Sequence, residues 1–276
     1  MNKLLSAHFS RLWKSKTLLL YVAGMMLFAG VMLFNIYRGT GLYETSLQFN
    51  DLPIFVFNIF IGGVLAAFVS LFLGTEYSDG TMCNKLIVGH RRSDLYLSNL
   101  FSSFVVGLIL AIVYVVVVIV GGIPVLASFE ADWKMILLLL ISSVLLILVY
   151  ASIYTMVSML FQNKAAVAVT TLIAFFVLLM VATQLQSRLS AEEFYTSDTL
   201  TDAGEYVQES VANPNYLRGT ERAVYQFFYD FLPTSQANQI AMSNMANLVQ
   251  MWIYSLAITV MTTVIGLLGF RKKDIK

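Results

Sequence analysis

Long apolar stretches without charge recur along the whole chain. Six of them reach the roughly 20 residues that a helix needs to cross a ~30 Å hydrocarbon core, and none contains Asp, Glu, Lys, Arg or His. Membrane β-strands are only about 10 residues long and alternate in polarity, so the pattern predicts helices. The predicted spans are residues 17–37, 53–74, 95–123, 135–160, 165–187 and 248–270.

Composition agrees with this pattern. The chain has 276 residues, of which 58% are hydrophobic and 12% charged, whereas soluble domains carry about 25% charged residues. This excludes soluble enzymes and nucleic-acid binders. Six spans leave no room for a large soluble domain, so we expect one all-α polytopic membrane domain over residues 1–276. A signal peptide is disfavoured, because the first apolar stretch is longer than 7–15 residues and no A-x-A-like site follows it.

The distribution of charge predicts the topology. The segment before the first span, the second and fourth connections and the C-terminal tail hold 12 of the 17 basic residues. The other three connections hold five basic residues and 12 of the 16 acidic ones. Because cytoplasmic loops keep Lys and Arg, both termini are predicted to be cytoplasmic. Cys83 is the only cysteine, so no intramolecular disulfide forms.

The segment of residues 1–16 predicts an amphipathic helix that lies in the inner membrane interface. Apolar side chains spaced by three and four positions share one face, and polar and basic side chains surround the other. The apolar set is Leu5, Phe9, Leu12 and Trp13, and the polar set is Lys3, Ser6, Arg11 and Lys14.

The second connection, residues 75–94, predicts a short capped helix between two spans. Asp79-Gly80 is a turn signal, and Gly89 is suited to end a helix. Thr81 and Ser93 are expected to cap the short helix and the third span. We expect the Glu76 carboxylate to cap amides of the short helix or to pair with Arg91 or Arg92. The alternative is a solvated loop whose arginines only reflect the excess of Lys and Arg in cytoplasmic connections.

Residue patterns for catalysis are missing from the sequence. There is no G-x-x-x-x-G-K-[ST] phosphate loop, and His8 and His90 have no ligand at helical spacing. The predicted spans hold no Asp, Glu, Lys, Arg or His, the residues that usually couple transport to protons or ions. Binding of sodium by carbonyl and hydroxyl oxygens alone is an open alternative. We therefore predict no catalytic, cofactor-binding or metal-binding residue, and an energy source in another subunit.

A family resemblance rests on the same connection. Glu76, Gly80 and Thr81 match the E-x-x-x-G-T signature after the second span of ABC-2 permeases, and residues 85–96 and 231–236 are also similar to stretches of that family. The resemblance implies the permease subunit of a bacterial ABC exporter in the plasma membrane. It further implies a second copy or related permease and two ATPase subunits that bind ATP and Mg. The residues expected to couple this chain to the ATPases are Glu76, Gly80, Thr81, Lys85, Arg91 and Arg92.

The fifth connection, residues 188–247, changes character along its length. Residues 192–209 are acidic and polar, whereas residues 225–231 are strongly aromatic and precede Pro233. We expect the aromatic segment to re-enter the outer membrane boundary, as the resemblance also implies. Its residues Tyr225, Phe227, Phe228 and Phe231 would close the exit of a transport pathway. The alternative is an extracellular domain with its own core, which about 60 residues barely support.

Few polar side chains mark the faces of the second and fifth spans. We expect these faces to oppose each other between two copies and to line a pathway, with candidate residues Phe57, Asn58, Ser70, Thr170 and Thr171. A stripe of small residues on the second span allows close helix approach, either within the chain or between copies. The stripe consists of Gly62, Ala66, Ser70 and Gly74.

These expectations combine into one function with two alternatives. The favoured function is the permease subunit of an ATP-driven exporter, with a hydrophobic or amphipathic substrate such as an antimicrobial peptide or a lipid-like compound. One alternative is a membrane sensor or scaffold that binds a ligand through its outer loop. The other is an ion-coupled carrier.

Overall fold

The computed structural model describes residues 2–43, 47–48, 52–128, 132–161, 163–200, 206–244 and 246–273. Six helices in these ranges are long and apolar enough to cross a membrane. They are α2 (Lys16–Tyr43), α3 (Phe57–Ser78), α5 (Arg92–Gly122), α6 (Trp133–Leu160), α7 (Lys164–Leu189) and α10 (Leu248–Lys272). Each matches one predicted span, which confirms the six-span helical fold.

Most helix ends lie further out than the sequence predicted, although α3 begins later, at Phe57. Helix α3 continues past Gly74 to Ser78, and α5 begins at Arg92. The apolar pattern marks where charge begins, whereas backbone hydrogen bonding continues until a turn or a cap stops it. Asp132 caps α6 by accepting a hydrogen bond from the Met135 amide at 3.2 Å.

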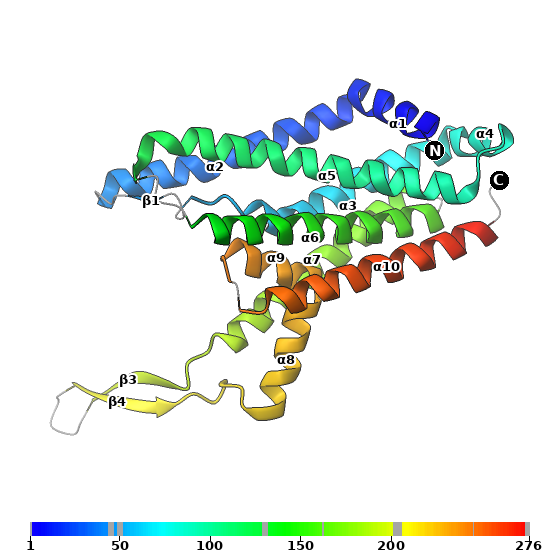
Figure 1. Cartoon of the computed structure of the whole chain (residues 1–276). Coiled ribbons are helices and arrows are strands. Elements are labelled where there is room, and N and C mark those ends of the chain that lie inside the picture. Colours follow the sequence, from blue (N-terminus) through cyan, green and yellow to red (C-terminus); the bar gives the residue numbers. More distant parts are fainter. Residues whose placement is uncertain are drawn as a thin grey trace.

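Helices α3 and α6 form the centre of the bundle, and the other spans surround them (Figure 1). Helix α2 packs on α5, α7 packs on α3, and α10 packs on α6. Small residues permit these approaches: a Cβ on Gly62 would lie 2.6 Å from Phe175, and one on Gly107 would lie 2.5 Å from Ile147. The stripe on the second span therefore serves packing within the chain.

The fourth connection is as short as the sequence indicated. Asn163 caps α7 through hydrogen bonds from the Ala165 and Ala166 amides at 3.1 and 3.2 Å. Helix α6 ends at Leu160 and α7 begins at Lys164, and α7 packs mainly on α3 rather than on α6.

Two small strand pairs were not predicted. The strands β1 (Leu47–Gln48) and β2 (Leu126–Ser128) pair in parallel beside the 3-10 turn η2 (Ile123–Val125). The strands β3 (Phe194–Leu200) and β4 (Tyr206–Ala212) form an antiparallel hairpin in the acidic part of the fifth connection. Figure 1 shows this hairpin projecting away from the helices.

The fifth connection continues through helices α8 (Gly219–Phe231) and α9 (Pro233–Ala241). All residues from 233 to 240 are buried, and α9 packs against α3, α6 and α7. Helix α8 instead runs across the direction of the spans (Figure 1). The segment inserted among the spans is thus the polar α9, whereas we expected the aromatic residues 225–231.

The N-terminus, the C-terminus and the short helix α4 (Thr81–Ile87) lie at one end of the bundle (Figure 1). Helix α1 (Asn2–Lys14) also begins there, and Ser15 separates it from α2. The Ser15 hydroxyl accepts a hydrogen bond from the Leu18 amide at 3.2 Å, so it caps α2 at this bend.

Candidate functional site

The connection between α3 and α5 is built by two glycines with positive φ. Gly80 has φ 65° and precedes α4, and Gly89 has φ 95° and follows it. The amides of Gly89 and His90 donate to the carbonyls of Leu86 and Lys85 at 3.0 and 3.2 Å, which is a Schellman end. Gly89 therefore ends the short helix as predicted.

The two predicted caps are wrong. Gly80, not Thr81, is the N-cap of α4, and the Thr81 hydroxyl donates to the Glu76 carbonyl at 3.0 Å. The N-cap of α5 is Arg91, so Ser93 lies inside the helix. Thr81 instead ties α4 back to the last turn of α3.

Glu76 lies in that last turn, and its side chain is completely buried. Its Oε1 atom accepts hydrogen bonds from Arg11 of α1 and Lys85 of α4, each at 2.8 Å. Arg11 also donates to Thr75 Oγ1 and packs 4.6 Å above the Phe72 ring. One carboxylate thus joins α1, α3 and α4, which we call the Glu76 cluster.

His8 completes the Glu76 cluster and is 1% exposed. Its Nδ1 atom lies 3.5 Å from Glu76 Oε1, and its Nε2 atom lies 3.4 Å from both Lys85 Nζ and Ser98 Oγ. Burial lowers the pKa of His8 to about 4; the charge of Glu76 opposes this shift, while Lys85 and Arg11 add to it. A neutral His8 leaves two cations facing one carboxylate.

The predicted partners of Glu76 are corrected by this geometry. Arg91 is exposed, and Arg92 points to the end of α10. Its Nη1 atom donates to the carbonyls of Phe270 and Arg271 at 2.9 and 3.2 Å, where α10 leaves carbonyls without helical partners. Among the basic residues expected to couple the chain to the ATPases, Lys85 contacts Glu76.

Helix α1 contacts the rest of the chain through residues of both predicted faces. Leu12 of the apolar face is buried, whereas Trp13 of the same face is 70% exposed. Arg11 of the polar face contacts the buried carboxylate of Glu76. Sequence reasoning missed both His8 and Arg11, since their partner is more than 60 residues away in the chain.

The C-terminal end of α4 presents two exposed aliphatic side chains. Ile87 is 82% exposed and Val88 is 77% exposed. They directly precede Gly89 and follow Leu86. Three consecutive aliphatic residues in a connection that also carries polar and basic side chains were the available signal for a contact surface.

Most predicted pathway residues lie inside the single chain. Phe57 is 1% exposed, and Asn58, fully buried, donates to Ser143 Oγ at 3.0 Å. Ser70 and Thr171 hydroxyls meet at 3.3 Å between α3 and α7. The faces of the second and fifth spans therefore oppose each other within one chain, which corrects the expectation that they face each other across two copies.

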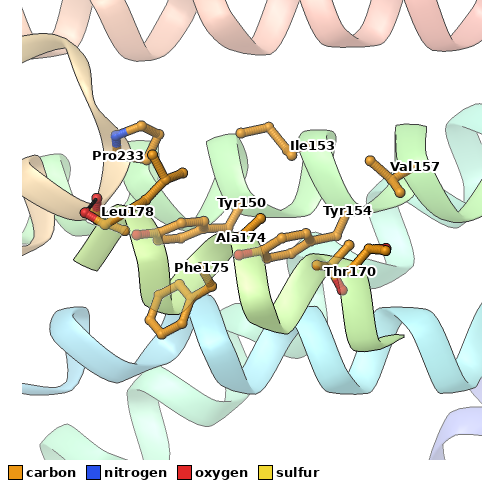
Figure 2. A pocket seen from close by; sticks show the side chains of 11 residues that line it. Tyr150, Ile153, Tyr154, Val157, Thr170, Ala174, Phe175, Leu178 and Pro233 are labelled. Atoms are coloured by element: carbon orange, nitrogen blue, oxygen red, sulfur yellow. Dashed lines mark hydrogen bonds between the residues drawn. The ribbon is translucent and has the colours of Figure 1, made fainter. Parts of the chain in front are cut away.

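Thr170 differs from these residues because it is exposed, and together with Thr171 it borders a groove of about 290 Å³ between α6, α7 and α9. Figure 2 shows Tyr150 and Tyr154 of α6 beside Phe175 and Ala174 of α7 in this groove. The lining is almost wholly apolar.

The predicted exit residues cluster on α8. Phe227 and Phe231 stack at 5.6 Å, and both contact the Tyr254 ring of α10 edge-on at 5.7 Å. Phe228 lies beside Phe227, and both are 46% exposed, whereas Tyr225 is half-buried. The aromatic residues therefore join α8 to the last span.

A buried network holds α8 and α9 together. Asp230 is 2% exposed, and its carboxylate accepts hydrogen bonds from the amides of Gln226, Gln239 and Asn247 at 3.0, 3.3 and 2.9 Å. Gln236 extends this network by accepting a hydrogen bond from Ser255 of α10 at 2.8 Å. These amides explain why a polar helix is buried among apolar spans.

The fold and the Glu76 cluster together define a class. A six-span helical membrane domain holds a short helix at one end, and ion pairs fix that helix to two other elements. The model of the family described as ABC-2 type transporter matches residues 2–188, so the chain belongs to this family and is a permease subunit of an ABC transporter. The match includes α1, the Glu76 cluster and the first five spans. Comparison with curated proteins finds no match.

Proposed function

We propose that this permease exports a hydrophobic or amphipathic compound, with an antimicrobial peptide or a lipid-like molecule as the leading class. Two ATPase subunits bind ATP and Mg and supply the energy. A second copy or a related permease completes the complex in the bacterial plasma membrane. Both termini and α4 face the cytoplasm.

The observation that carries the coupling role is the attachment of α4. Through Glu76, a force on α4 reaches both α1 and α3, because Lys85 and Arg11 bind the same carboxylate oxygen. Ile87 and Val88 extend from α4 without cover from the described part of the chain. We assign these two side chains to a shallow apolar recess of the ATPase, with the basic residues that follow at the rim of the contact.

The groove beside α7 is the best-supported candidate for the substrate route. Its apolar walls suit an apolar or amphipathic molecule, and α7 continues beside it with exposed Ile173, Phe176 and Met180. We place the second permease against this face, so that two grooves enclose one route. Phe227 and Phe228 of α8 would close its outer end.

Reconstituted complexes test this function. The purified chain should hydrolyse no ATP alone, and vesicles containing chain and ATPase should accumulate substrate with ATP. Thr170→Trp should block transport and leave ATP hydrolysis intact, whereas Val116→Trp, on an exposed face of α5, should leave both intact. ATP hydrolysis without transport of any tested compound would favour a sensor, and transport driven by an ion gradient alone would favour a carrier.

Thiol labelling tests the orientation. Cys83 lies in α4, so a membrane-impermeant maleimide should label it only after cells are permeabilised. Phe194→Cys, made in a Cys83→Ser background, should be labelled in intact cells, because β3 lies in the predicted outer connection. The reverse labelling pattern would contradict the proposed topology.

A further inference from the structure

A second apolar groove, of about 460 Å³, lies between α1, α5 and α6. Its size is within the range of ~300–1,000 Å³ typical of small-ligand sites. Helix α5 lies between the other two helices in Figure 1. The groove is lined by Leu5, Leu97, Ser98, Leu100, Phe101, Phe104 and Leu148.

The shape and chemistry of this groove suit a linear apolar ligand. Leu97, Phe101 and Phe104 follow one face of α5 over seven residues, which is about 10 Å along the helix. Ser98 is the only polar residue in the lining, and its hydroxyl already donates to the Leu95 carbonyl at 3.0 Å. A ligand gains contact area here and almost no hydrogen bonds.

The groove also lies close to basic charge at one end of the bundle. Leu97 follows the start of α5 by five residues, or about 8 Å. Arg91 directly precedes α5, and its side chain is exposed. In the proposed orientation this depth belongs to the cytoplasmic leaflet, where exposed basic residues attract anionic headgroups.

We propose that this groove binds one acyl chain of an anionic phospholipid from the cytoplasmic leaflet. The assignment of the leaflet rests on the orientation given under the proposed function. Arg91 attracts the headgroup, while the acyl chain lies along α5 in contact with Leu5.

Occupancy of the groove reaches the Glu76 cluster through one side chain. Ser98 lines the groove, and its Oγ atom lies 3.4 Å from His8 Nε2. Phe9 of α1 packs edge-on against Phe101 at 6.3 Å. A bound acyl chain therefore packs against α1 and stabilises the contacts of His8 and Arg11 with Glu76.

Native mass spectrometry of the purified full chain in detergent tests the site without an ATPase, so its outcome is independent of transport. Titration with phosphatidylglycerol should show one saturable bound lipid. Leu148→Trp, which fills the groove from α6, should weaken binding at least tenfold. The matched control Leu137→Trp lies at an exposed position of the same helix and should bind as wild type. Equal binding by both variants, or equal loss in both, would overturn the site.

Two further arms separate the parts of the proposal. Phosphatidylcholine, which has a zwitterionic headgroup, should bind at least tenfold more weakly than phosphatidylglycerol, and equal affinity would overturn the role of the anionic headgroup. Phosphatidylglycerol should slow hydrogen exchange of residues 2–14 in wild type but not in Leu148→Trp. Unchanged exchange in the wild type would overturn the link to α1. Leu100→Trp is a second groove-filling variant, used if Leu148→Trp does not fold.

Discussion

Replacing Glu76 by Gln removes the one negative charge that binds α1 to α4. Breaking a buried ion pair on one side costs ~3–5 kcal/mol. Arg11 and Lys85 are 36% and 20% exposed, so water partly solvates them after the change, and we expect about 3 kcal/mol. For a chain of this size that lowers the melting temperature by roughly 6–12 °C.

The assay is thermal unfolding of the purified chain in detergent, with ATP-driven transport by the reconstituted complex as second readout. Glu193→Gln is the matched control, because Glu193 pairs at 2.6 Å with Arg218 in an exposed ion pair, which is worth ~0–1 kcal/mol. Glu76→Gln should also lower transport per ATP hydrolysed. The double variant with Arg11→Gln should lose less stability than the two single losses together. A melting temperature as little affected as that of Glu193→Gln would refute the reasoning.

Three further predictions concern other parts of the chain. His8 has a lowered pKa, so between pH 6.5 and 4 the unfolded chain binds a proton that the folded chain does not. Lowering the pH from 7.5 to 5 should therefore lower the free energy of unfolding by about 2 kcal/mol, measured by thermal unfolding. His8→Gln should remove this pH dependence. Gly80→Val should destabilise by ~1–2 kcal/mol through its positive φ, whereas Gly80→Asn should be milder; equal thermal shifts would contradict this. Asp230→Ala removes an acceptor shared by the amides of Gln226, Gln239 and Asn247 and should cost ~3 kcal/mol, measured as faster hydrogen exchange in residues 233–241; unchanged exchange would contradict the network.

The sequence predicted the spans because a membrane imposes a minimum length of uncharged helix. It also predicted the turn at Gly80 and the stop at Gly89, since positive φ and helix ends leave local signals. The sequence predicted that Glu76 pairs with a basic residue, but it did not predict which one. The choice of Arg11 over Arg91 depends on how α1 lies on α3, and no local pattern encodes that.

The insertion of α9 could not be read from composition. Its Gln and Asn side chains look like those of a solvent-exposed loop, and only the arrangement around Asp230 shows that Gln236 and Gln239 have partners inside the protein. Similarly, Asn58 and Thr171 marked polar faces correctly, but packing of α3 against α7 in one chain was one of two arrangements that the pattern allowed. Long-range packing decided between them.

We propose above that α4 transfers energy from an ATPase to this chain. A photoreactive amino acid at Val88 in the assembled complex tests it most directly, with the same group at Phe194 of β3 as the control. The account predicts a crosslink to the ATPase from Val88 and none from Phe194. An ATPase that co-purifies with the chain but crosslinks from Phe194, or not from Val88, would contradict the claim.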